Sequence, residues 1–213
     1  MLQVEVGGAT LQLLPQRAAY LPAQRALLVA DVHVGKAASF RGLGVPVPAG
    51  TTAGTLARLS AALSTTGAEH LIVLGDLVHS SRAWAAATRA AVMQWRATHG
   101  TLRVTLLRGN HDARAGRLPG ELRIEVVDPP WPCGPYQLMH EPSASPRGYA
   151  LAGHVHPCVT IGRAADRLRL PCFHFGARVG VLPAFGEFTG SHALPREEGD
   201  RLFAIADGRV LAV

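Results

Sequence analysis

The sequence predicts an α/β domain, and three observations support this class. In the first half, apolar runs typical of buried strands alternate with two amphipathic helical segments, which is the βαβ alternation of a parallel sheet. In the second half, short strand-like runs follow one another with little helical pattern. The chain has 213 residues and is 48% hydrophobic, which is enough for one sizeable core, so we expect a single domain over 1–213.

The first half contains six predicted elements. In chain order they are an alternating edge hairpin, a buried strand, a helix, a strand, a helix and a strand, at 4–14, 25–30, 51–64, 70–74, 84–98 and 102–107. Prolines mark a loop at 46–48 between the first strand and the first helix. The three apolar strands are expected to lie parallel and adjacent.

The second half is predicted to be rich in strands that share the core with the first half. The predicted strands lie at about 123–127, 136–139, 150–152, 159–162, 167–175 and 202–206. Asp207-Gly208 before the run at 209–213 is typical of a two-residue turn that closes a terminal hairpin.

Metal-binding residue types occur in five stretches, each directly after an apolar run. The stretches lie at 31–33, 75–76, 109–112, 140 and 153–156. Since open α/β sheets place their ligands beyond the strand ends, the series predicts one site assembled from distant loops. We expect Asp31 with His33, and His154 with His156, to reach it as i, i+2 pairs of extended segments.

The candidate ligands are four imidazoles, two carboxylates and one amide, namely His33, His140, His154, His156, Asp31, Asp76 and Asn110. A nitrogen and oxygen donor set without thiolates favours Mn, Fe or Zn over Mg or Ca. The number of donors is too large for one tetrahedral ion and suits two divalent ions. A centre of this kind activates water and stabilises the attacking and leaving oxygens of a phosphate ester.

Other residues near these stretches are candidates for catalysis and substrate binding. His111 could donate a proton to the leaving oxygen, and Asp112 could orient His111 or a ligand. Candidate substrate contacts are Lys36, His79, Arg41 and Arg108. A solvated surface charge is the alternative for the three basic residues, and a structural hydrogen bond is the alternative for His79.

The charge balance and cysteine content bear on partners and compartment. The formal net charge is +6, with 20 Arg and one Lys, which fits a polyanionic partner such as nucleic acid, although an indifferent basic surface is equally compatible. No apolar run reaches the length of a membrane span, and the first residues lack the pattern of a signal peptide, which favours the cytoplasm. Three cysteines without a Cys-x-x-Cys pair fit reduced thiols.

The five stretches together resemble the calcineurin-like metallophosphoesterase superfamily, whose pattern runs D-x-H, G-D, G-N-H-D/E, H and G-H-x-H. The resemblance covers about 27–160 and implies a four-layer αββα sandwich of two mixed sheets. It also implies that Asp31, His33 and His156 hold one metal and Asn110, His140 and His154 the other, with Asp76 bridging and His111 assisting catalysis. The chain departs from many members at Met139-His140, where they have Gly-His.

A narrower resemblance is to a bacterial subgroup, the ligase-associated DNA-damage-response endonucleases of the PdeM type. It rests on Asp31-Val32-His33-Val34-Gly35-Lys36, which resembles D-L-H-L-G-K, and on the stretches 170–173 and 182–190. The subgroup is small and has no capping domain, in agreement with the length of this chain. The resemblance implies cleavage of DNA phosphodiesters and functional association with a DNA ligase, a helicase and an exonuclease. Manganese is the expected metal on the basis of the donor set, with iron or zinc as alternatives.

Two other functions remain open on the sequence alone. One is a phosphatase or pyrophosphatase for a small nucleotide-like molecule, because a metal centre recognises only the phosphate. The other is a non-catalytic binding scaffold with the same fold, which would not need to retain His111. A long basic groove would favour DNA and a closed pocket a small ligand, whereas a site that binds no metal would favour the scaffold.

Overall fold

The structure of the protein is a computed structural model that describes residues 1–47, 50–163 and 166–213. Its first part contains seven strands and all the helices of the described chain, at β1 Leu2–Val6, β2 Ala9–Leu14, β3 Ala18–Leu21, η1 Pro22–Gln24, β4 Ala26–Val29, α1 Lys36–Arg41, α2 Thr51–Thr66, β5 His70–Leu74, η2 Ser81–Ala83, α3 Ala86–Thr98, β6 Arg103–Leu107, α4 Asn110–Ala115, η3 Gly120–Leu122 and β7 Glu125–Val127. The second part contains nine strands, at β8 Trp131–Cys133, β9 Tyr136–Leu138, β10 Tyr149–Ala152, β11 Pro157–Ile161, β12 Leu168–Phe175, β13 Val179–Val181, β14 His192–Ala193, β15 Arg201–Ala206 and β16 Arg209–Ala212.

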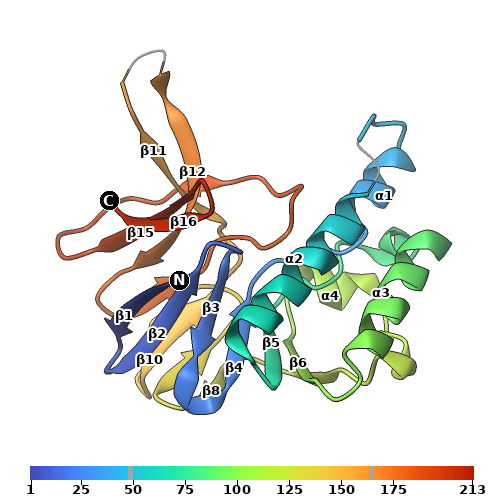
Figure 1. The fold of residues 1–213 in the computed structure, drawn as a ribbon, viewed down its shortest axis with the longest axis horizontal. Coiled ribbons are helices and arrows are strands. Elements are labelled where there is room, and N and C mark those ends of the chain that lie inside the picture. Colours follow the sequence, from blue (N-terminus) through green and yellow to red (C-terminus); the bar gives the residue numbers. More distant parts are fainter. Residues whose placement is uncertain (48–49, 164–165) are drawn as a thin grey trace.

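The strands form two mixed sheets, one from each part of the chain. The first has the order β1-β2-β3-β4-β5-β6-β7, antiparallel up to β4 and parallel from β4 to β7. The second has the order β14-β11-β12-β13-β10-β9-β8, with β15 paired to β12 and β16 to β15. Helices α2 and α3 lie on one side of the molecule and the strands of the second sheet on the other (Figure 1). The predicted sandwich of two mixed sheets is confirmed.

The core has two main layers, because the parallel strands are buried on both faces. Alternate residues of β4 point in opposite directions, so Leu28 belongs to the cluster between the sheets while Leu27 and Val29 pack toward α2 and α3. Strands β4, β5 and β6 are parallel and in step, with Val29 opposite Val73 and Val73 opposite Leu106. Their carboxyl ends therefore reach the same edge of the sheet.

Most predicted strands and both long helices are present, with boundaries shifted by a few residues. The terminal hairpin is confirmed, with Asp207 and Gly208 in the left-handed conformation that a type I′ turn requires. The sequence did not predict β3, β8, β13 and β14 or the one-turn helices, because segments of two to six residues are too short to show a period. The loop predicted at 46–48 falls partly outside the described residues.

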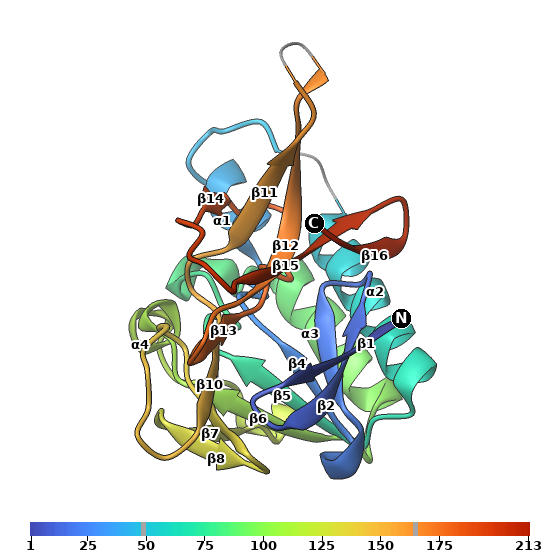
Figure 2. The ribbon, with the colours of Figure 1, turned by 90° about the vertical axis from the view of Figure 1, so that its left-hand side faces the viewer.

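Three further features of the fold are the character of its helices, the state of its cysteines and one projecting hairpin. None of the helices in the described ranges has the length and apolarity needed to cross a membrane. The three cysteines are free, as predicted, and all three are buried. The hairpin of β11 and β12 extends well beyond the body of the protein (Figure 2).

Candidate metal centre

The five sequence stretches meet at one edge of the seven-stranded sheet. Asp31 and Asp76 lie just beyond the ends of β4 and β5, and Asn110 lies three residues after the end of β6. Three adjacent parallel strands thus deliver side chains to one place. His140 and the 153–156 stretch reach it from loops after β9 and β10 of the second sheet.

The first cluster comprises Asp31, His33 and His156, whose ligand atoms lie within 4.8 Å of one another. His156 Nε2 lies 3.5 Å from Asp31 Oδ1. The opposite ring nitrogen, Nδ1, donates to the carbonyl oxygen of Gly190 at 3.0 Å. Because a carbonyl oxygen can only accept, this bond leaves Nε2 of the neutral ring free to bind a cation.

The second cluster comprises Asp76, His140 and His154, again with ligand atoms within 4.8 Å of one another. Asn110 adjoins it, with Oδ1 3.0 Å from His140 Nε2. The same Nε2 lies 3.1 Å from His154 Nδ1 and 3.5 Å from Asp76 Oδ2. His140 Nδ1 donates to the Leu74 carbonyl oxygen at 3.0 Å, so Nε2 is an acceptor that faces other acceptors. Such a group of atoms is suited to a cation.

Asp76 lies between the two clusters. Its Oδ2 is 3.5 Å from His140 Nε2 and 3.9 Å from His33 Nε2. Its Oδ1 accepts the N–H of His111 at 2.9 Å, which fixes the orientation of the carboxylate. Burial raises the pKa of Asp76 above its usual value, against the opposing effect of His140. A nearby cation would favour the charged carboxylate.

The side chains present fit divalent cations, as two observations indicate. Asp31 Oδ1 and His33 Nδ1 are buried and have no hydrogen-bond partner within the described part of the chain. Burial, together with the positive charge of Lys36 and the neighbouring imidazoles, lowers the pKa of His33 to about 2. A neutral imidazole beside an unsatisfied carboxylate oxygen is suited to metal binding rather than to an ion pair.

The backbone reaches this geometry through left-handed conformations. Five of the nine non-glycine residues with positive φ in the described chain are candidate ligands, namely Asp31, His33, Asp76, His154 and His156. The prediction that the two i, i+2 pairs lie on extended segments is therefore wrong, although both pairs reach the site. Each such conformation costs about 1 kcal/mol, so backbone strain is concentrated at the centre.

Two glycines allow the ligands to pack directly against the backbone. At Gly75, where φ is +79°, an added Cβ would lie 2.1 Å from His140 Nδ1. At Gly109 it would lie 2.3 Å from Asp76 Oδ1. Any side chain at either position would displace a candidate ligand.

The stretch 109–112 was expected to lie at the end of a strand, but most of it belongs to helix α4. Asn110 is its first residue rather than the end of a strand. Asp112 does not orient the His111 ring. Its Oδ2 accepts the N–H groups of Asp76 at 2.7 Å and Gly109 at 3.0 Å, and its Oδ1 accepts that of Val78 at 3.1 Å. Asp112 thus positions the loop that carries the candidate ligand Asp76, which is the second of its two predicted roles, and its assignment among the catalytic residues is corrected.

His111 and His79 lie together beside the clusters. Their rings are stacked with centroids 4.9 Å apart, and His111 Nδ1 donates to the carbonyl oxygen of His79 at 2.9 Å. His111 Nε2 is therefore directed toward the centre, 4.0 Å from Asp76 Oδ2. Burial lowers the pKa of His79 to about 4, with a further contribution from Lys36. The sequence placed both histidines at the site, and the structure brings both there.

The three basic candidates lie at different places around the centre. Lys36 begins α1 and is partly buried; burial lowers its pKa, while Asp31 and Asp76 act to raise it, so its charge lies close to both carboxylates. Arg41, at the other end of α1, donates to the Val47 carbonyl oxygen at 3.4 Å. Arg108 is exposed and pairs with an aspartate outside the centre. Of the three, only Lys36 has its charge close to the two carboxylates.

The sequence did not show how the segment 182–190 contributes to the centre. Two N–H groups of this segment donate to the carbonyl oxygens of Ala30 and Asp31, at 2.7 and 3.0 Å. The carbonyl oxygen that orients His156 belongs to Gly190, also in this segment. These contacts involve backbone atoms, so no pattern of side chains could have predicted them.

Comparison with known proteins agrees with this geometry. The profile of the calcineurin-like phosphoesterase family matches residues 24–173. The crystal structure of Pseudomonas putida nuclease MPE is 47% identical in sequence, with 100% of this chain and 99% of that chain covered and a TM-score of 0.87. No curated protein matches the chain.

Two more distant solved structures are each 15% identical, with 88% of this chain and 96% of the other covered. They are YfcE, a phosphoesterase from E. coli, with a TM-score of 0.41, and a Vps29 double mutant from Entamoeba histolytica, with a TM-score of 0.35. Similarity at this level says nothing about the function of this chain.

Proposed function

Because the chain belongs to the calcineurin-like phosphoesterase family and is a metal-dependent phosphoester hydrolase, we propose that it is a two-metal phosphodiesterase that cleaves DNA. The observation that carries the two-metal proposal is the position of Asp76, whose Oδ2 faces a histidine of each cluster, at 3.5 and 3.9 Å. A carboxylate placed between two donor groups is suited to bridge two cations.

The residues of each cluster have distinct proposed roles. Asp31, His33 and His156 hold one cation, Asn110, His140 and His154 hold the other, and Asp76 binds both. When bound, two divalent cations supply Lewis acidity and an activated water for attack on phosphorus. The N/O donor set without thiolates fits manganese, with iron or zinc as alternatives.

His111 is the proposed proton donor to the leaving oxygen. Its Nδ1 donates to a backbone carbonyl, so a donor role requires the doubly protonated ring, in which Nε2 carries a second proton directed into the centre. Lys36 is proposed to contact the phosphate, since its charge lies beside Asp31 and Asp76. His79 supports the His111 ring through stacking.

DNA is the proposed substrate on two grounds. The relative with 47% identity over the whole chain is a nuclease, and the net charge of +6 favours a polyanion. We further propose a role in DNA repair, in association with a DNA ligase, a helicase and an exonuclease, on the basis of the subgroup resemblance at 31–36 and 182–190. Three free thiols fit a reducing compartment such as the cytoplasm.

A substrate panel tests the proposal. Purified protein with Mn²⁺ is expected to hydrolyse bis(p-nitrophenyl) phosphate and DNA in preference to nucleoside mono- and triphosphates. Preference for nucleotides or inorganic pyrophosphate over DNA would instead support the small-molecule phosphatase. No turnover of any phosphoester by folded, Mn²⁺-loaded protein would contradict the proposal.

A further inference from the structure

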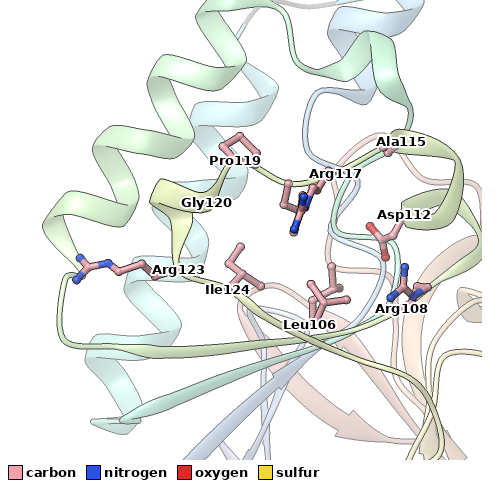
Figure 3. A pocket seen from close by; sticks show the side chains of 12 residues that line it. Leu106, Arg108, Asp112, Ala115, Arg117, Pro119, Gly120, Arg123 and Ile124 are labelled. Atoms are coloured by element: carbon pink, nitrogen blue, oxygen red, sulfur yellow. The ribbon is translucent and has the colours of Figure 1, made fainter.

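A cavity of about 470 Å³ lies beside α4, at the open edge of the first sheet. Its walls come from β6, β7, the loop after α4 and η3 (Figure 3). Its lining includes Leu106, Arg108, Asp112, Arg117, Arg123 and Ile124. We call it the Arg117 cavity. Its size is that of a pocket for one small ligand.

Two guanidinium groups face this cavity. The Arg117 side chain extends into its centre, and Arg108 lies at the side near Asp112 (Figure 3). Arg117 has no hydrogen-bond or ion-pair partner among the residues that the structure describes. Arg108 donates its Nε–H to Asp128 at 2.9 Å, which leaves its two terminal nitrogens for an anion. The Arg123 side chain, in contrast, points away from the cavity (Figure 3).

The floor of the cavity is apolar. Leu106 of β6 is 1% exposed, and Ile124 lies next to it as a partly buried side chain of the same hydrophobic cluster. An apolar floor with guanidinium groups above it matches a ligand that has a flat, weakly polar part and a phosphate. A nucleotide has both, because its base can pack on the floor while arginines bind its phosphate oxygens.

Asp112 also lines the cavity, but its charge is compensated. Its two oxygens accept three backbone N–H groups, those of Asp76, Val78 and Gly109. These hydrogen bonds stabilise the carboxylate and partly offset its negative charge. The carboxylate therefore does not exclude a phosphate bound between Arg108 and Arg117.

The Arg117 cavity and the metal centre have Arg108 as a common border. A second cavity, of about 500 Å³, is lined by Arg108 together with Asn110 and His140, which belong to the second cluster. Arg108 thus borders both cavities. Its Cα lies within about 8 Å of that of Asn110, because consecutive Cα atoms are about 3.8 Å apart. Arg108 therefore places the Arg117 cavity beside the second cluster.

We propose that the Arg117 cavity binds one nucleotide of the substrate strand, adjacent to the phosphodiester at the metal centre. Arg108 and Arg117 bind its phosphate, and its base packs on the half-buried Ile124, beside Leu106. The inference rests on the proposed function, since it takes the substrate to be a nucleic acid strand. It identifies Arg117 as a residue that determines affinity for nucleic acid.

The test compares Arg117→Ala with Arg123→Ala in steady-state hydrolysis of an oligodeoxynucleotide with Mn²⁺. Each variant loses one guanidinium from a residue that lines the cavity, but only the Arg117 side chain extends into it. Loss of a charge-assisted phosphate contact is expected to raise the KM for the oligonucleotide about tenfold in Arg117→Ala. The KM of Arg123→Ala is expected to stay within about twofold of the unsubstituted protein.

A small substrate separates binding in the cavity from damage to the metal centre. Bis(p-nitrophenyl) phosphate has no adjoining nucleotide, so its hydrolysis is expected to respond far less to Arg117→Ala than that of the oligonucleotide. Equal KM values for the oligonucleotide in all three proteins would overturn this inference alone. Failure of the unsubstituted protein to cleave any DNA while it cleaves bis(p-nitrophenyl) phosphate would overturn the choice of DNA, and this inference with it.

Discussion

Asp31 and Asp76 of the metal centre are 0% and 2% exposed, and backbone N–H groups fix one oxygen of each carboxylate. In the neighbouring Arg117 cavity, Arg108 and Arg117 are exposed, and the ion pair of Arg108 lies at the surface. The centre is thus preorganised by the fold, whereas the arginines of the cavity are free to adjust to a ligand. Substitutions in the centre should affect every substrate, and those in the cavity should affect nucleic acid most.

The largest effect is expected for Asp76→Asn. An amide in place of the carboxylate removes the negative charge that both cations share, so turnover of every phosphoester should fall by at least about 10³-fold. Metal content measured after dialysis should fall as well. Asp207→Asn makes the same chemical change in a surface turn and serves as the control. Retention of both cations at full occupancy in Asp76→Asn would argue against a bridging role.

His111→Ala should reduce turnover by about 10²- to 10⁴-fold, the range for loss of a general acid. Metal content should stay unchanged, because the ring is assigned to proton transfer and its backbone N–H still reaches Asp76. The measurement combines steady-state kinetics with metal analysis of the same sample. If the substitution released metal instead, His111 would have to be reassigned as a ligand.

Asp112→Ala should chiefly reduce stability. The substitution leaves three backbone N–H groups without their acceptor, and the free energy of unfolding should fall by about 3 kcal/mol. Urea unfolding in EDTA measures this without a contribution from bound metal. A large loss of activity with unchanged stability would restore Asp112 as a catalytic residue.

The smallest effect is expected for Arg108→Ala. Its guanidinium is half exposed and already paired with Asp128, so the KM for an oligonucleotide should rise only about threefold. The change should be weaker at high salt, since exposed charges are screened. A loss of turnover on bis(p-nitrophenyl) phosphate as large as that of His111→Ala would show that Arg108 acts at the metal centre itself.

The sequence predicted which residues come together at the metal centre, but not the backbone conformations that place them there. The order of the five stretches was sufficient to bring together Asp31, Asp76 and Asn110, because the parallel strands that precede them end at one edge of the sheet. The left-handed conformations of His33 and His154 were not predictable, since only a few per cent of non-glycine residues adopt positive φ and tertiary contacts determine which ones do.

Sequence patterns also failed to predict features that depend on hydrogen bonds to backbone atoms or on very short elements. Asn110 was assigned to a strand end because it follows an apolar run, but it begins a helix of only six residues. The role of Asp112 depends on N–H groups of a loop 34 to 36 residues away in sequence. The Arg117 cavity left no sequence signal, because single arginines at separate positions resemble an ordinary basic surface.

The central claim is that the two clusters form one metal-dependent centre that hydrolyses phosphodiesters. Hydrolysis of bis(p-nitrophenyl) phosphate by the purified protein, measured during titration with Mn²⁺ after treatment with EDTA, tests it most directly. We expect no turnover in EDTA and full turnover once about two equivalents of Mn²⁺ are bound per chain. Turnover that is unaffected by EDTA, or no turnover with two equivalents bound, would contradict the claim.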